Sequence, residues 1–175
     1  MVRLSREKIM QLLRALDEAL SVESVVGEVY LVGGAVMCLV FDQRADTLDV
    51  DAWFHPPERI RRLAQEVGAK LGVAPDWLND AVKGFMSERG AFQTFLDLGN
   101  LKVFAAVPEY LLAMKCLAFR LGPEFHDEAD VRFLLRYLNL ETVDQAKDVL
   151  SRYYPLERFP VKALFALAEL LDARS

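Results

Sequence analysis

The sequence contains few of the residues from which many common active sites are built. Only two cysteines, Cys38 and Cys116, and two histidines, His55 and His126, occur among its 175 residues. The cysteines lack the spacing of metal ligands, and neither histidine stands in a pattern typical of a zinc site or a catalytic triad. Both cysteines lie in apolar segments, where a free thiol behaves as a small buried side chain. Zinc sites and catalytic triads are therefore not indicated, and a reducing, cytoplasmic location is expected.

Basic side chains and long apolar runs are scarce as well. Lysine and arginine together number 21 against 26 aspartates and glutamates, which gives a formal net charge of −5. This balance excludes a broad basic face that grips duplex nucleic acid, and only the local patch of Arg59, Arg61 and Arg62 suits an RNA end. The first residues lead into an amphipathic pattern, and no apolar run is long enough to span a bilayer. Neither a signal peptide nor a membrane anchor is expected.

The chain has the composition of an ordinary globular protein. Hydrophobic residues make up 53% and charged residues 27% of the sequence, which provides enough apolar material for a real core. We expect an α+β fold with a small mixed β-sheet, flanking helices and a helical C-terminal part. The αβ core with its N-terminal helix is predicted at 1–107, and the helical part at 108–175.

Apolar periodicity and turn residues predict the elements of the first half. Ser5 is a suitable cap for an amphipathic helix, and Gly72 is suited to end another one. Gly33 and Gly34 interrupt an apolar run and separate a strand from a helix. The expected elements are a helix after Ser5, a strand at 29–32, a short helix at 35–41, a strand at 47–54, a helix at 58–71 and an irregular stretch through Gly90.

The second half predicts one hairpin followed by helices. Two β-prone runs meet at Gly99 and Asn100, a pair that is compatible with a turn. Beyond Pro108 the pattern is helical, and proline, glycine and asparagine separate the helices. The strands are expected at 92–98 and 101–107, and the helices at 108–121, 127–138, 141–153 and 160–172.

Two aspartates in the second strand are the leading candidates for chemistry. Successive side chains of a strand alternate between faces, so Asp49 and Asp51 are expected to project to the same side. Neighbouring carboxylates repel each other, and Mg²⁺, which takes hard oxygen ligands, offsets that repulsion. The alternative is an exposed strand end with two solvated aspartates. If a third metal ligand exists, it is expected from the hairpin, where Asp97 is the natural candidate.

A glycine pair precedes these acids at the junction of a strand and a helix. Gly33 and Gly34 leave their backbone amides accessible to a phosphate, and the start of the next helix adds N–H donors. A tight turn without a ligand is the commoner meaning of such a pair, and the acidic strand that follows favours the functional interpretation. No Gly-Lys-Ser/Thr follows, so this is not a Walker loop. Arg44 and Thr47 are suited to contact phosphate, or equally to ordinary surface and strand-start roles.

A lysine in the helical half is surrounded by apolar residues. Lys115 has Leu111 and Leu112 as neighbours on its helix, so its ammonium needs an anion or must reach solvent along its aliphatic stem. Asp127 and Asp130 begin the next helix, where carboxylates also favour the positive helix end. A contact of Lys115 with either aspartate would direct the lysine toward a phosphate.

In this order, the motifs resemble those of a known superfamily. The chain is similar to the nucleotidyltransferases related to DNA polymerase β, most closely to the small bacterial proteins of the DUF6036 group and more distantly to AbiEii-type toxins. The resemblance covers about residues 28 to 138. It is carried by Leu31-Val-Gly33-Gly34-Ala, Arg44-Ala-Asp-Thr47-Leu-Asp49-Val-Asp51, Trp77-Leu-Asn79-Asp80, Leu111-Leu-Ala-Met-Lys115 and Asp127-Glu-Ala-Asp130.

The resemblance implies a role for each of these positions. The second glycine position is often serine in the family, whereas Gly34 supplies no hydroxyl here. By similarity, Gly33 and Gly34 hold the nucleotide phosphates, Asp49 and Asp51 bind the divalent metal, and Lys115 with Asp127 or Asp130 completes the site.

The expected function is nucleotidyl transfer that depends on Mg²⁺ or Mn²⁺. An acceptor hydroxyl attacks the α-phosphorus of an NTP and pyrophosphate leaves, with metal binding and positioning doing most of the catalysis. The acceptor is an RNA end, a protein side chain or a small molecule, and the similarity to toxins implies an antitoxin partner. The main alternative is a regulatory module of the same fold that binds nucleotide or metal without turnover, and a helical interaction protein is a third.

Overall fold

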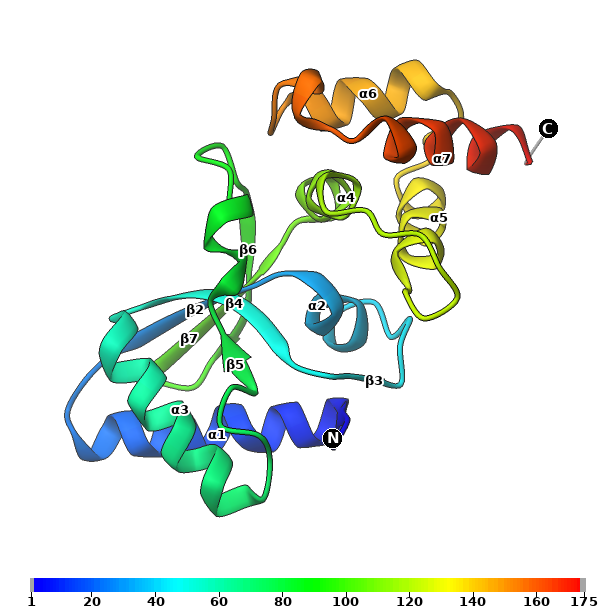
Figure 1. Cartoon of the computed structure of the whole chain (residues 1–175). Helices are drawn as coiled ribbons and strands as arrows, with labels where there is room; N and C mark the ends of the chain where they lie inside the picture. Colours follow the sequence, from blue (N-terminus) through cyan, green and yellow to red (C-terminus); the bar gives the residue numbers. More distant parts are fainter. Residues whose placement is uncertain (1, 174–175) are drawn as a thin grey trace. The chain divides into compact units, whose positions relative to one another are not determined.

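The computed structural model describes residues 2–173. Within this range, seven α-helices accompany a five-stranded mixed sheet and a small two-stranded sheet. These elements confirm the α+β fold, the mixed sheet and the helical C-terminal part that the sequence predicted (Figure 1).

Packing within the chain defines two units. The first, here called the αβ unit, runs to Gly84 and includes Phe92–Ala106; the second, the helical unit, consists of Phe85–Ala91 and the chain from Val107 onward. The segment 85–91 therefore packs with the helical unit, although the sequence-based division had assigned it to the αβ core.

The sheet of the αβ unit has the strand order β5-β4-β2-β7-β6. The central pair β2 and β7 is parallel, as is the edge pair β4 and β5, while β2 with β4 and β6 with β7 are antiparallel. The hairpin predicted around Gly99 is thus confirmed as β6 and β7. The bounds are β2 Gly27–Leu31, β4 Val50–His55, β5 Leu78–Asn79, β6 Phe92–Asp97 and β7 Leu101–Ala106; the two-stranded sheet pairs β1 Leu4–Ser5 with β3 Asp46–Thr47.

Two amphipathic helices cover one face of this sheet. Helix α1, Arg6–Val22, begins after Ser5, whose side chain accepts a hydrogen bond from the backbone N–H of Lys8, as an N-cap does. Helix α3, Pro57–Leu71, ends at Gly72, which adopts a left-handed conformation. Both helices and both caps were predicted, and Figure 1 shows α1 and α3 together below the strands.

The segment between β2 and β4 differs from the prediction. Helix α2, Gly33–Leu39, includes both glycines and so begins two residues earlier than expected. The predicted strand over 47–54 is interrupted at Leu48 and Asp49, because β3 pairs with β1 whereas β4 joins the five-stranded sheet. Asp49 consequently lies just before β4, and strand alternation does not determine its direction.

A short strand forms where the sequence showed only an irregular stretch. Strand β5 places Leu78 beside Val50 and Asn79 beside Asp51 at the edge of the sheet. Pairing of this kind depends on a distant partner, so the local pattern gave no signal for it. A 3₁₀ helix, Ala81–Phe85, follows.

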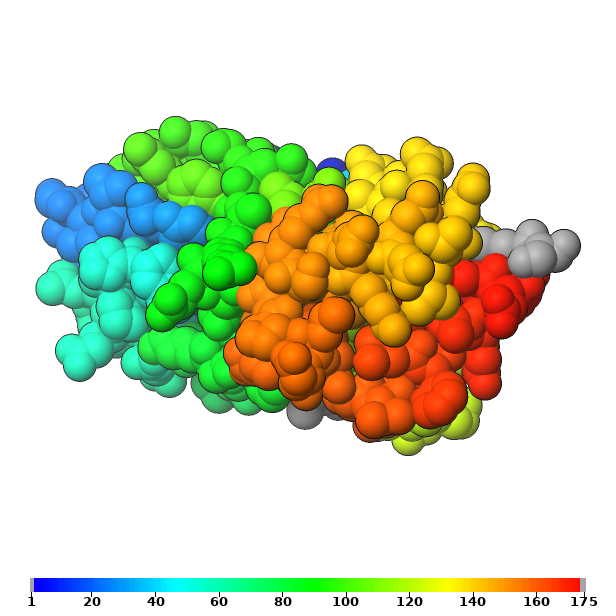
Figure 2. Space-filling model, turned by 90° about the horizontal axis from the view of Figure 1, so that it is seen from above, coloured from blue at the N-terminus to red at the C-terminus, as the bar shows by residue number. Residues whose placement is uncertain are grey.

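The helical unit contains the four helices expected from the sequence. Helix α4 is almost entirely buried, and α5, α6 and α7 each pack against it. Figure 2 shows α6 and α7, in orange and red, as neighbouring segments of the surface. The bounds are α4 Pro108–Leu117, α5 Asp127–Tyr137, α6 Val143–Ser151 and α7 Val161–Asp172.

None of the helices between residues 2 and 173 combines the length and the apolar character that a bilayer crossing requires.

Candidate functional site

The glycine turn and Asp51 lie side by side at one end of the sheet. Gly33 adopts φ +63°, and a Cβ atom placed on it would lie 3.2 Å from Oδ2 of Asp51. The backbone supports this approach, since the N–H of Val32 donates to the carbonyl oxygen of Asp51 at 3.0 Å. The carboxylate of Asp51 therefore lies at the glycine turn.

Gly34 lies against the two polar residues of the loop before β4. A Cβ atom on Gly34 would lie 2.7 Å from Nη1 of Arg44 and 2.9 Å from Oγ1 of Thr47. A side chain at this position would therefore require Arg44 or Thr47 to shift. Arg44 and Thr47 therefore border the glycine turn, as a phosphate-contacting role requires; Thr47 is buried.

Asn79 is a site residue that the analysis of individual residues did not single out. Its side-chain N–H donates to Oδ2 of Asp49 at 3.2 Å, and its Oδ1 accepts from the backbone N–H of Ala81 at 3.2 Å. Asn79 thereby ties Asp49, which stands outside the strand, to the edge of the sheet. The only signal in the sequence was its place in a motif of the family resemblance.

The structure does not bring Asp97 to these two aspartates. In the register of the sheet, Asp97 of β6 is opposite Lys102 of β7, and the same row of residues continues across the sheet through Glu28 of β2 to His55 at the far end of β4. His55 is four positions beyond Asp51, which is about 13 Å along a strand. The Oδ1 of Asp97 instead accepts from the N–H of Gly99 at 3.0 Å in the hairpin turn. The prediction of Asp97 as a metal ligand was wrong, because the chain reverses between the two strands of the hairpin.

The candidate metal ligands of the αβ unit are accordingly reduced to Asp49 and Asp51. Among residues 2–173, no three histidine, cysteine, aspartate or glutamate side chains are grouped so that they could hold a metal ion. Asp49 and Asp51 supply hard oxygen donors, which suits Mg²⁺ when substrate phosphates and water complete the coordination.

Lys115 makes the predicted contact with both aspartates of α5. Its Nζ lies 2.6 Å from Oδ2 of Asp130 and 3.7 Å from Oδ1 of Asp127, and all three side chains are buried. The lysine therefore does not extend to solvent along its aliphatic stem. No side chain caps the start of α5 at His126, but Asp127 and Asp130 lie in its first turn, where the predicted preference of carboxylates for the positive helix end also applies.

Arg120, whose side chain is exposed, reaches this buried group from the surface. Its backbone N–H and its Nε both donate to Oδ2 of Asp127, at 3.0 and 2.9 Å. Burial by itself would raise the pKa of Asp127, but the hydrogen bonds from Arg120 and the charges of Lys115 and Arg120 outweigh it and lower the pKa below its ordinary value. One buried cation, Lys115, and one exposed cation, Arg120, thus balance the two buried carboxylates.

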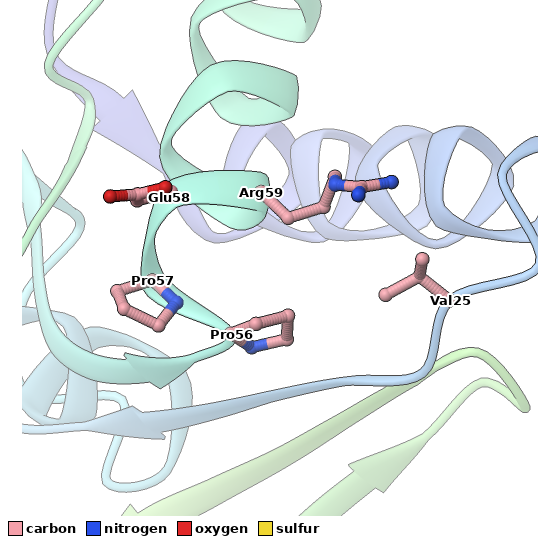
Figure 3. Close-up of a pocket in the computed structure, with 5 residues that line it drawn as sticks. All are labelled: Val25, Pro56, Pro57, Glu58 and Arg59. Carbon is pink, nitrogen blue, oxygen red and sulfur yellow. The ribbon is translucent and has the colours of Figure 1, made fainter.

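A separate open pocket lies where α3 begins. It is lined by Val25, Pro56, Pro57, Glu58 and Arg59, and Figure 3 shows the side chains of Glu58 and Arg59 pointing in opposite directions. Arg59 is held by Glu23 at 2.6 Å. This pocket is at the His55 end of β4, away from Asp51, and contains Arg59 of the predicted basic patch but none of the residues predicted to bind metal or nucleotide.

No family model, curated protein or solved structure matches the chain.

Proposed function

We propose that the chain is a Mg²⁺- or Mn²⁺-dependent nucleotidyltransferase that transfers NMP from an NTP to an acceptor hydroxyl. The observation that supports this most is the approach of Gly33 to Asp51, because it places a backbone suited to phosphate beside a carboxylate suited to a cation. The proposal also assigns the αβ unit to the fold of the nucleotidyltransferase superfamily. In that fold a strand, a glycine turn and a helix follow one another, and an acidic strand lies next to the turn.

The residues at the glycine turn fit a metal-bound triphosphate. Asp49 and Asp51 would hold the divalent ion, which when bound would offset the negative charge that builds up on the phosphates. Gly33 and Gly34 bring the backbone of the turn close to Asp51, Arg44 and Thr47, and the guanidinium of Arg44 and the hydroxyl of Thr47 would donate to phosphate oxygens bound there. Asn79 keeps Asp49 in place.

The proposed reaction exchanges one phosphorus–oxygen bond for another. The acceptor oxygen forms a bond to the α-phosphorus, the bond from that phosphorus to the bridging oxygen breaks, pyrophosphate leaves and the hydroxyl proton is released. The chain contributes mainly by holding the reactants in line, which accounts for much of the catalysis in reactions of this type. RNA or protein is the acceptor in this proposal, and an antitoxin is the partner that the resemblance to toxins suggests.

The buried group of Lys115, Asp127 and Asp130 has a different place in the proposal. The lysine charge is already balanced by two carboxylates within the helical unit. These contacts therefore support a structural role for Lys115 in the helical unit. Its role in completing the nucleotide site follows only from the resemblance.

The number of acidic ligands favours a second candidate, a regulatory module that binds nucleotide or metal without turnover. The αβ unit offers Asp49 and Asp51 without a third carboxylate, since Asp97 lies at the other end of the sheet. Two carboxylates are enough to bind Mg²⁺ with a nucleotide, whereas a third one commonly assists the attacking hydroxyl.

Labelled NTPs distinguish the two candidates. The protein is incubated with Mg²⁺ and each α-labelled NTP in the presence of cellular RNA and protein, and label in macromolecules is measured. We expect transfer that is lost in Asp49→Asn and Asp51→Asn but retained in the matched control Asp97→Asn. Nucleotide binding without transfer, lost in the same two variants, would support the module. Equal transfer by all four proteins would contradict the assignment of the site.

A further inference from the structure

The face of the sheet that carries Asp51 also carries a row of aromatic side chains. Trp53, Tyr30 and Phe104 are directly opposite one another on β4, β2 and β7. Because side chains two residues apart share a face, Trp53 lies on the same side of β4 as Asp51, about 7 Å further along the strand. We call Trp53, Tyr30 and Phe104 the aromatic row.

The rings of the aromatic row support one another. The centroid of Tyr30 lies 4.7 Å from that of Phe104 in a stacked arrangement and 5.0 Å from that of Trp53. The hydroxyl of Tyr30 donates to Oε2 of Glu28 at 2.9 Å, which fixes its ring. Trp53 is the most exposed ring of the row, at 36%, so it presents a braced aromatic surface to solvent. Helices α1 and α3 cover the opposite face, where Val29, Phe54 and Val103 are buried.

The order along the strands is glycine turn, Asp51, aromatic row. Gly33 follows the end of β2 beyond the row of Asp51, while Tyr30 and Trp53 lie on the other side of that row. In phosphoryl transfer the attacking and leaving oxygens are roughly in line with the phosphorus. If pyrophosphate departs at the glycine turn, the acceptor therefore approaches from the side of the aromatic row.

We infer that Trp53, braced by Tyr30 and Phe104, stacks against an unpaired base at the 3′ end of a single-stranded RNA acceptor and positions its terminal hydroxyl beside Asp51. This inference deepens the proposed function and rests on it. It makes Trp53 a positioning residue, and it commits the acceptor to RNA rather than protein.

Single-stranded RNA fits this face better than duplex does. Stacking on aromatic side chains requires splayed bases, which a duplex does not offer. The next row of residues on the same face consists of His55, Glu28, Lys102 and Asp97. Because two of these side chains are acidic, the row does not form a continuous basic track for the two phosphate backbones of a duplex. Stacking on the aromatic row, rather than phosphate charge, is the expected source of affinity.

Oligonucleotide binding in EDTA without NTP tests the inference separately from transfer. A short single-stranded oligouridylate is titrated onto the intact protein, and binding is followed by fluorescence anisotropy of a 5′ label. We expect Trp53→Ala to weaken binding about tenfold or more, and Trp53→Phe to retain most of it because the ring remains. Phe165→Ala, which removes a smaller but more exposed aromatic ring from α7, is the control for non-specific aromatic contacts.

Tryptophan fluorescence supplies an independent measurement. Trp77 is 1% exposed, so quenching by the oligonucleotide is expected from Trp53 and absent in Trp53→Phe. Unfolding curves establish that each variant is folded. Three outcomes overturn the inference: equal affinity of Trp53→Ala and the parent, equal affinity for a strand whose 3′ nucleotides lack bases, or no binding by the parent. A parent dimer that Trp53→Ala converts to monomer would also overturn it, by placing a second copy on the aromatic row. None of these outcomes excludes nucleotidyl transfer to another acceptor.

Discussion

A side chain at Gly33 would meet the carboxylate of Asp51, since its Cβ atom would lie 3.2 Å from Oδ2. The same glycine adopts φ +63°, a conformation that costs other residues about 1–2 kcal/mol. Two constraints therefore act at one position, one on the backbone and one on the space beside the acid. Their effects can be separated, because Gly72 shares only the first.

Gly33→Ala is expected to reduce stability and transfer, whereas Gly72→Ala is expected to reduce stability alone. Gly72 has φ +70° but no atom within 4 Å of its Cβ position, so it is a matched control for backbone strain. Each variant should lose about 1–2 kcal/mol in urea unfolding. Label transfer and nucleotide affinity, measured on folded protein, should fall only in Gly33→Ala. A similar fall in both variants would show that the space beside Asp51 is not used by a ligand.

Asn79→Ala is expected to weaken metal-dependent nucleotide binding by about tenfold to a hundredfold, the usual effect of removing a group that orients a metal ligand. The substitution removes the N–H donor to Asp49 and leaves that carboxylate on a segment outside the strand. Isothermal titration with nucleotide and Mg²⁺ measures the change. Asn79→Leu keeps the approximate size of the side chain but removes both of its hydrogen-bonding atoms, so it should bind as poorly. Normal binding by Asn79→Leu would exclude a role for this hydrogen bond.

Lys115→Met is expected to destabilise the protein by about 3–5 kcal/mol, because it leaves the buried carboxylates of Asp130 and Asp127 short of one cation. Chemical unfolding measures the loss. The double variant Lys115→Met/Asp130→Asn should recover part of it, since the charge that lost its partner is also removed. Recovery marks the contact as an ion pair; additive losses in the double variant would contradict that.

Acid is expected to destabilise the protein through Asp127. Its pKa is lower in the folded protein than in the unfolded chain, so the contribution is fully present above the ordinary aspartate pKa. As the pH falls from there through the folded pKa, the unfolded chain binds more protons and the contribution is lost. Unfolding free energies measured from neutral pH to pH 3 should decline less steeply in Asp127→Asn than in the parent. Parallel curves would show that other carboxylates account for the acid sensitivity.

Patterns that depend on neighbours in the chain predicted their elements well. The apolar stripe of Ile9, Leu12 and Leu16, together with the cap at Ser5, determines α1, because both signals act within a few helical turns. The glycine pair and the apolar run around it likewise predicted that a strand gives way to a helix. Lys115 needed an anion for the same local reason, since its helical neighbours are apolar, and the aspartates that follow provide it.

Pairing between distant segments decided the rest. Sequence alternation placed Asp49 and Asp51 on one strand, yet Asp49 lies outside it because β3 and β4 join different sheets. Asp97 was a reasonable ligand by its chemistry, but the register of the hairpin put it at the far end of the sheet.

The sequence by itself predicted the helices and most strands of the five-stranded sheet, and it named the side chains that we propose for a cation and a phosphate. Only the tertiary structure decided that Gly33 meets Asp51, that Asn79 holds Asp49 and that Trp53, Tyr30 and Phe104 form one row. The physical reason is range: helix and turn preferences act over a few residues, whereas strand order and register follow from burying one apolar face of the whole sheet at once.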